Sequence, residues 1–190
     1  MRCLITNSMK KVWYLSRYVQ STTFSHSWKK RPEKLWGYYC TGQYVDVTNR
    51  FIVQPGYRTR ILGTQMYKYQ LDGFLHWGYN FYNAEHSIFP IDPYRCTDAA
   101  GAFPSGDPFL VYPGADGEPE ESLRIMLMDE AMSDLCAMNY LEELAGRDVV
   151  MSCIEPEGGE KVEFASYPRS VSYLVEMRKR VNREIEKRVK

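Results

Sequence analysis

The sequence has few of the residues that build disulfide frameworks and metal sites. Its five cysteines are scattered, no two show Cys-x-x-Cys spacing, and its three histidines do not fall at a metal-ligand spacing. A disulfide scaffold and a zinc site are therefore not indicated, and we expect reduced thiols in a cytoplasmic protein with no metal and no other cofactor. The residues concerned are Cys3, Cys40, Cys96, Cys136, Cys153, His26, His76 and His86.

An excess of charge and a long apolar run are also missing. Lys and Arg together number 24, as do Asp and Glu, so the formal net charge is zero and no overall field attracts nucleic acid or an acidic membrane. No stretch is long and apolar enough for a signal peptide or a membrane span. At 190 residues, 44% hydrophobic and 25% charged, the chain has the composition of one folded domain with a sizeable core. We therefore expect neither a nucleic-acid nor a membrane partner.

Aromatic residues are abundant instead, and they gather in the first part of the chain. The sequence holds 15 Tyr, 8 Phe and 4 Trp, most of them before residue 115. The segment Asp72–Asn83 concentrates them: an apolar run after Gly73 predicts a buried strand, which passes directly into rings and amides. Rings stack on flat ligand faces and amides bond hydroxyls, so this strand end is a candidate ligand surface. A core strand with a tyrosine-rich edge is the structural alternative.

The order of predicted elements indicates an α/β fold. A strand at Leu35–Thr41, a helix at Tyr57–Leu71 and the strand after Gly73 form a βαβ unit, which gives parallel strands. A long loop over Ala84–Asp107 precedes a third strand at Phe109–Tyr112. Helices follow, the first announced by Gly117-Glu118-Pro119, at Glu120–Leu144, Val149–Ile154 and Arg169–Lys190.

Three parallel strands leave open edges and uncovered faces, which parallel sheets normally avoid. The pattern therefore favours the last part of a closed β/α barrel. Residues 1–34 read as a strand near Val12–Leu15 followed by an irregular basic loop, and residues 35–190 as the barrel portion.

Several long motifs in this order resemble the C-terminal part of domain-of-unknown-function family 4091, which is similar to the catalytic barrel of glycoside hydrolase family 123. The resemblance covers roughly Leu35 to the C-terminus, and residues 1–34 match poorly. The motifs are Asn49–Ile52, Arg60–Gly63, Tyr67–Tyr69, Gly73–Tyr82, Gly101–Asp107, Val111–Gly114, Ser122–Arg124 and Leu141–Arg147.

The resemblance implies an α/β fold that is the C-terminal portion of a (β/α)₈ TIM-type barrel, truncated in this chain, with the ligand cleft at the C-terminal ends of the strands. It also implies glycosidase chemistry on N-acetylated hexosamines. In that chemistry the substrate's own acetamido group attacks the anomeric carbon, and an Asp-Glu pair orients it and protonates the leaving oxygen. The family's pair lies in an earlier strand. Asp129-Glu130 falls inside a predicted outer helix, so we reject it as that pair and expect this chain alone to be inactive.

Barrel logic selects the candidate ligand residues, because side chains at strand ends and in the following loops face the cleft. Trp77 is the expected floor of a sugar site, with Tyr79 or Asn80 bonding hydroxyls. Three loop residues are candidate carboxylates: Glu85, Asp92 and Asp107. The full set of candidate substrate-binding residues is Tyr39, Trp77, Tyr79, Asn80, Tyr82 and Asn83.

Three hypotheses remain open from the sequence. The chain is a glycoside hydrolase-like barrel segment that faces an N-acetylhexosamine-type sugar, a non-catalytic carbohydrate-binding module, or a structural remnant without a ligand. Under the first hypothesis the partner is the missing barrel half.

Overall fold

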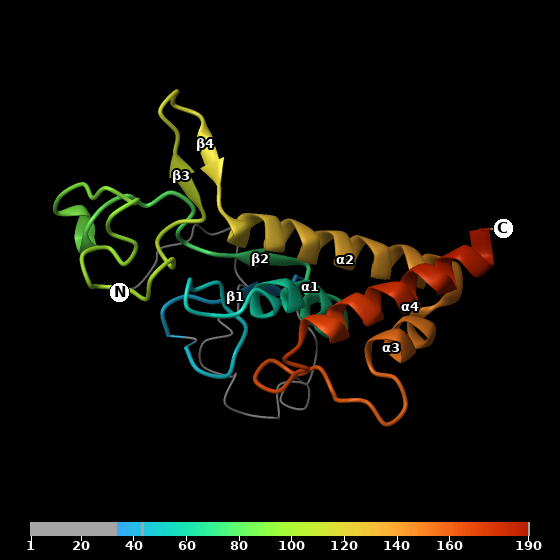
Figure 1. The fold of residues 1–190 in the computed structure, drawn as a ribbon. Helices are drawn as coiled ribbons and strands as arrows, with labels where there is room; N and C mark the ends of the chain where they lie inside the picture. The colour runs from blue at the N-terminus through green and yellow to red at the C-terminus, as the bar shows by residue number, and fades with distance from the viewer. Residues whose placement is uncertain (1–33, 43, 190) are drawn as a thin grey trace.

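A computed structural model of the chain describes residues 34–42 and 44–189 (Figure 1). The predicted strand near Val12–Leu15 lies outside these residues. Within the described part no helix is both long enough and apolar enough to cross a membrane. The elements are β1 (Trp36–Tyr38), α1 (Tyr57–Tyr69), β2 (Gly73–Leu75), a 3₁₀ turn (Glu85–Ser87), β3 (Val111–Pro113), β4 (Pro119–Glu121), α2 (Leu123–Ala145), α3 (Arg147–Ile154) and α4 (Val171–Val189).

The predicted βαβ unit is confirmed. β1 and β2 pair in parallel with Trp36 opposite Gly73 and Tyr38 opposite Leu75, and α1 connects them. The predicted stop also holds, because α1 ends at Gln70 in the left-handed conformation (φ 53°) with its N–H bonded to carbonyls of the last turn. The unit therefore follows directly from a helical apolar stripe between two short strand signals.

The third predicted strand does not join this sheet. β3 pairs antiparallel with β4, with Tyr112 opposite Glu120, and the two form a hairpin that projects from the body (Figure 1). The prediction of three parallel strands is therefore wrong, and the described residues form two separate two-stranded sheets. The turn explains the error: Gly117 adopts a positive φ of 89°, and the Gly114 N–H bonds the Glu118 carbonyl at 2.8 Å.

The same hairpin moves the start of the long helix. We expected Pro119 in its first turn, but Pro119 lies on β4 and the helix begins at Leu123, with Ser122 as the N-cap residue. Leu123 is 69% exposed, so the predicted apolar stripe begins further along. The stripe is buried at Ala131, Met138 and Leu141.

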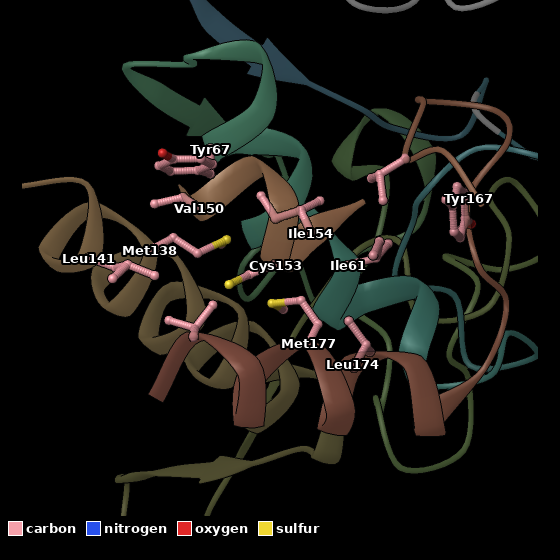
Figure 2. Packing of buried hydrophobic residues seen from close by; sticks show 12 residues of the cluster. Ile61, Tyr67, Met138, Leu141, Val150, Cys153, Ile154, Tyr167, Leu174 and Met177 are labelled. Carbon is pink, nitrogen blue, oxygen red and sulfur yellow. The ribbon is translucent and has the colours of Figure 1, made fainter. Parts of the chain in front are cut away.

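The main core lies between the helices. α2, α3 and α4 pack together with α1 around a cluster of fully or nearly fully buried side chains (Figure 2). The predicted short helix and last helix are both confirmed. The cluster consists of Ile61, Tyr67, Met138, Leu141, Val150, Cys153, Ile154, Val162, Tyr167, Leu174, Met177 and Val181.

A second, smaller core links the helices to the sheet. Leu62 and Met66 on the other side of α1 pack with Leu35, Tyr39 and Leu71 around the strands. Of the predicted methionine stripe, Met128 and Met132 pack against this core, whereas Met126 is 49% exposed. α1 therefore lies between the sheet and α2, so the position of the sheet depends on the position of α2.

A buried carboxylate also joins the helices. Asp134 of α2 is fully buried and accepts hydrogen bonds from Arg60 of α1 (2.8 and 3.0 Å) and from Arg178 of α4 (2.9 Å). Arg60 contacts Glu130 as well, at 3.0 Å. Removing one partner of such a cluster leaves an uncompensated charge, so the cluster fixes the relative positions of α1, α2 and α4.

Gly63 allows α1 and α2 to cross closely, because a Cβ atom there would lie 1.9 Å from the carbonyl oxygen of Ala131. We predict that Gly63→Ala forces the helices apart and lowers the free energy of unfolding by about 1 to 3 kcal/mol, despite the better helix propensity of alanine. Chemical denaturation measured by circular dichroism checks this.

The matched control is Gly42→Ala, since no atom of the described residues lies within 4 Å of the added Cβ at that position. It should change stability by no more than about 0.5 kcal/mol. Equal effects of the two substitutions would show that the helix crossing does not depend on Gly63.

Candidate functional site

The carboxyl ends of β1 and β2 meet at one edge of the sheet, because the two strands are parallel. Tyr39 follows β1, and His76 and Trp77 follow β2. Two loop residues, Arg50 and Asp107, reach the same edge and contact these side chains. We call these five residues the strand-end cluster. Segments far apart in the sequence thus converge at the carboxyl ends of the two parallel strands.

The carboxylate of Asp107 holds two neighbouring side chains. It is fully buried, its Oδ1 lies 3.1 Å from Nε2 of His76, and its Oδ2 accepts the indole N–H of Trp77 at 2.9 Å. A buried carboxylate is costly unless its oxygens are bonded, so these two contacts are strongly favoured. Asp107 therefore fixes the orientation of both rings that follow β2.

The ring of His76 is neutral, with a single proton position that its neighbours define. Its Nδ1 accepts from the Gly78 backbone N–H at 3.0 Å and from the guanidinium of Arg50. Nε2 must then carry the proton and donate it to Asp107. Burial lowers the pKa of His76 to about 4, against the opposing effect of its hydrogen bond to Asp107. The imidazole is therefore held in one orientation between the Arg50 cation and the Asp107 anion.

Arg50 is a buried cation, 1% exposed, whose guanidinium also donates to the carbonyls of Gly78 and Asp107, the latter at 3.0 Å. Burial lowers its pKa to about 10. Tyr39 lies next to His76, with ring centroids 5.5 Å apart, and burial raises the pKa of its hydroxyl above the ordinary range. Within the described residues, the Tyr39 hydroxyl and Nε of Arg50 have no hydrogen-bond partner.

Trp77 is the solvent-exposed member of the strand-end cluster. Phe81 and Phe103 contact its indole edge-on, at centroid distances of 5.2 and 5.1 Å, and Asp107 binds its N–H. The residue is nevertheless 36% exposed. A ring fixed on several sides and open to solvent is suited to stacking against a flat ligand.

The structure divides the predicted site residues into two groups. Tyr39 (4% exposed) and Trp77 belong to the strand-end cluster. The other four lie further along, beside β3 and the long loop. Tyr79 accepts the N–H of Leu110 through its carbonyl, Asn80 bridges to Phe109, Tyr82 donates to the Val111 carbonyl, and Asn83 bridges to Pro90.

Sequence reasoning missed Arg50 and His76 as members of the site. Both belong to segments that we had singled out, but His76 was considered only as a metal ligand. Asp107 was one of three loop carboxylates. The other two are exposed: Glu85 lies 3.7 Å from His86, and Asp92 accepts the N–H of Tyr94 at 3.0 Å.

Two further arrangements bear on the chemistry. Asp129 and Glu130 are exposed on α2, and Glu130 pairs with Arg60. Among residues 34–42 and 44–189, no three His, Cys, Asp or Glu side chains are placed to share a metal ion. The four cysteines of the described part, the residues Cys40, Cys96, Cys136 and Cys153, are free thiols.

Comparisons with known proteins point to one family. Residues 6–141 match the family model for the glycoside hydrolase 123 catalytic domain, a range that contains the whole strand-end cluster and ends before α3. A comparison with curated proteins finds no match.

The structure is similar to that of a family 123 glycoside hydrolase from Clostridium perfringens, which was solved to explain glycolipid glycan hydrolysis. The TM-score is 0.60 and the sequence identity 19%. The similarity covers 81% of this chain but only 28% of the Clostridium chain. At this identity the likeness establishes the fold alone.

Burial of neutral His76 makes stability depend on pH. In the unfolded chain a histidine has a pKa near 6.5, whereas His76 in the folded chain has a pKa of about 4. Between these values the unfolded state binds a proton that the folded state does not. Stability should therefore fall as pH drops from about 6.5 towards 4, by at most about 3 kcal/mol. Unfolding measured at a series of pH values checks this.

His76→Gln should flatten that dependence, because the amide keeps a donor for Asp107 but does not titrate. The control His86→Gln removes a histidine whose side chain is 65% exposed and should leave the slope unchanged. An unchanged slope in His76→Gln would exclude His76 as its source.

Proposed function

The chain belongs to the glycoside hydrolase 123 family, through its catalytic domain, and we propose that the strand-end cluster binds a carbohydrate ring against the indole of Trp77. The observation that carries this proposal is the state of that indole: its N–H is held by buried Asp107, yet the residue is 36% exposed. A ring held in this way presents a flat apolar face without the entropic cost of ordering it on binding.

The proposed ligand is an N-acetylhexosamine-type sugar, the substrate class implied by the sequence resemblance. The hydrolysis of glycolipid glycans by the Clostridium relative supports a glycan ligand. Exposed Tyr79 and Asn80, two and three residues beyond Trp77 in the sequence, offer a hydroxyl and an amide to such a ligand. The resemblance to domain-of-unknown-function family 4091 stays a prediction.

We further propose that the chain contributes binding to hydrolysis, with the reaction's acid pair supplied from outside the strand-end cluster. Asp107 is buried and already accepts two hydrogen bonds, so it has no access to a glycosidic oxygen. Asp129-Glu130 is the one Asp-Glu dipeptide in the sequence, and its place on α2 argues against that role. The parallel β1–β2 unit fits a larger (β/α)₈ barrel completed by further strands.

Trp77→Ala tests the proposal through ligand stabilisation of the folded chain. With N-acetylgalactosamine at about ten times its Kd, the original chain should gain about 1.4 kcal/mol, or roughly 3 to 6 °C in Tm. Trp77→Ala should lose this shift, because the stacking face is gone. Thermal unfolding followed by circular dichroism, with and without the sugar, measures it.

Trp77→Phe is the matched control, since it keeps an aromatic face but loses the N–H that Asp107 binds. It should retain part of the shift. A full shift in Trp77→Ala would place any sugar site elsewhere, and no shift in the original chain would reject carbohydrate binding by this chain.

A further inference from the structure

Two large apolar side chains lie at a projecting point of the long loop, in the segment 84–89 that we call the loop tip (Figure 1). The Ala84 N–H bonds the Phe89 carbonyl at 2.9 Å, which closes the loop tip on itself. Ile88 is 73% exposed and Phe89 is 51% exposed. Apolar side chains gathered at one exposed point are a feature of surfaces that contact another molecule.

The backbone of the loop tip adopts a strained conformation. His86 and Ser87 both have a positive φ, of 59° and 57°, which residues other than glycine rarely adopt. The Ser87 N–H bonds the Ala84 carbonyl at 2.9 Å, and no residue of the 3₁₀ turn is buried. Core packing therefore does not account for the strain. Strained backbone of this kind is concentrated at binding sites.

A groove that can receive the loop tip lies between α2 and α4, which we call the α2–α4 groove. Its volume is about 460 Å³, within the range of about 300–1,000 Å³ that holds a drug-sized ligand. Met132 and Ala137 of α2 and Ile185 of α4 give it an apolar lining. The loop tip and the paired helices lie at opposite ends of the molecule (Figure 1). The loop tip therefore cannot enter the groove of its own chain.

The charges of the two surfaces are complementary as well. Glu85 gives the loop tip an exposed carboxylate, and the loop tip contains no Lys or Arg. Arg178, which lines the groove, donates to Asp134 through Nη1 and to Asn182 through Nε. Within the described residues its Nη2 makes no hydrogen bond, so it can bind a carboxylate, the partner that a guanidinium prefers. Asp129 is the one acidic residue in the lining.

We propose that the loop tip of one copy of the chain docks into the α2–α4 groove of a second copy. Ile88 and Phe89 then contact the apolar lining, and Glu85 binds Arg178. The two surfaces are different, so the contact is head-to-tail, and a pair of copies keeps one loop tip and one groove free for further copies. The inference does not depend on carbohydrate binding, because Trp77 belongs to neither surface.

Sedimentation velocity of the full chain at increasing concentration tests the proposal. Dimers and larger species should form with a Kd on the order of 10–100 µM, because a loop tip in a groove buries less area than a standard interface. Phe89→Asp places a charge in the loop tip, and Cys136→Glu places one in the groove at an exposed position of α2. Each variant alone should remain a monomer.

A mixture of these two variants gives the decisive measurement. Phe89→Asp keeps an intact groove and Cys136→Glu keeps an intact loop tip, so the mixture should form dimers of one copy each. These dimers should not grow further, because the remaining loop tip and the remaining groove both carry a substitution. A mixture that stays monomeric would overturn the head-to-tail contact.

The matched control is Val53→Asp, which places the same charge at another highly exposed apolar residue and should leave the association unchanged. Circular dichroism of each variant as a monomer checks its fold, and Ile88→Asp and Ser133→Glu are the second variants for the loop tip and the groove. An original chain that stays monomeric at every concentration would overturn the proposal. Association of Phe89→Asp as strong as that of the original chain would overturn it too.

Discussion

The buried carboxylate of Asp107 is the interaction on which the candidate site depends. It accepts hydrogen bonds from the two residues that follow β2, and its own backbone carbonyl accepts one from Arg50. An anion at full burial is tolerable only with such partners, so the long loop must end against the strand end. One anion and one cation thus fix three chain segments that are distant in the sequence.

The scaffold beneath the site is equally constrained. α1 lies between the sheet and α2, and Gly63 brings the two helices into direct backbone contact. Asp134 then bonds arginines of α1 and α4, so these helices do not slide past one another. Because His76 and Trp77 follow a strand attached to this layer, their positions are set before a ligand arrives. Preorganisation of this kind reduces the cost of binding.

Features that depend on local sequence pattern were predicted correctly. Features that depend on contacts with distant segments were not. The stripe of α1 and its stop before Gly73 gave the βαβ unit, and the position of Trp77 after a strand marked it as a surface ring. The strand predicted at Phe109–Tyr112 lies close to the observed strand β3. A local strand pattern does not specify the partner strand, and the turn at Gly117 pairs β3 with β4 in a hairpin. Arg50 and His76 were missed because their roles arise from contacts across 26 or more residues.

The hydrogen bonds of the cluster also determine which kind of ligand contact Trp77 makes. Arg50 and Gly78 donate to His76, which donates to Asp107, and Trp77 donates to the same carboxylate. The indole N–H therefore points into the protein and is not offered to a ligand. In the proposed site, Trp77 would therefore contact a sugar ring by its apolar face alone. Selection among sugars would then come from other polar groups, and this gives exposed Tyr79 and Asn80 their importance to the proposal.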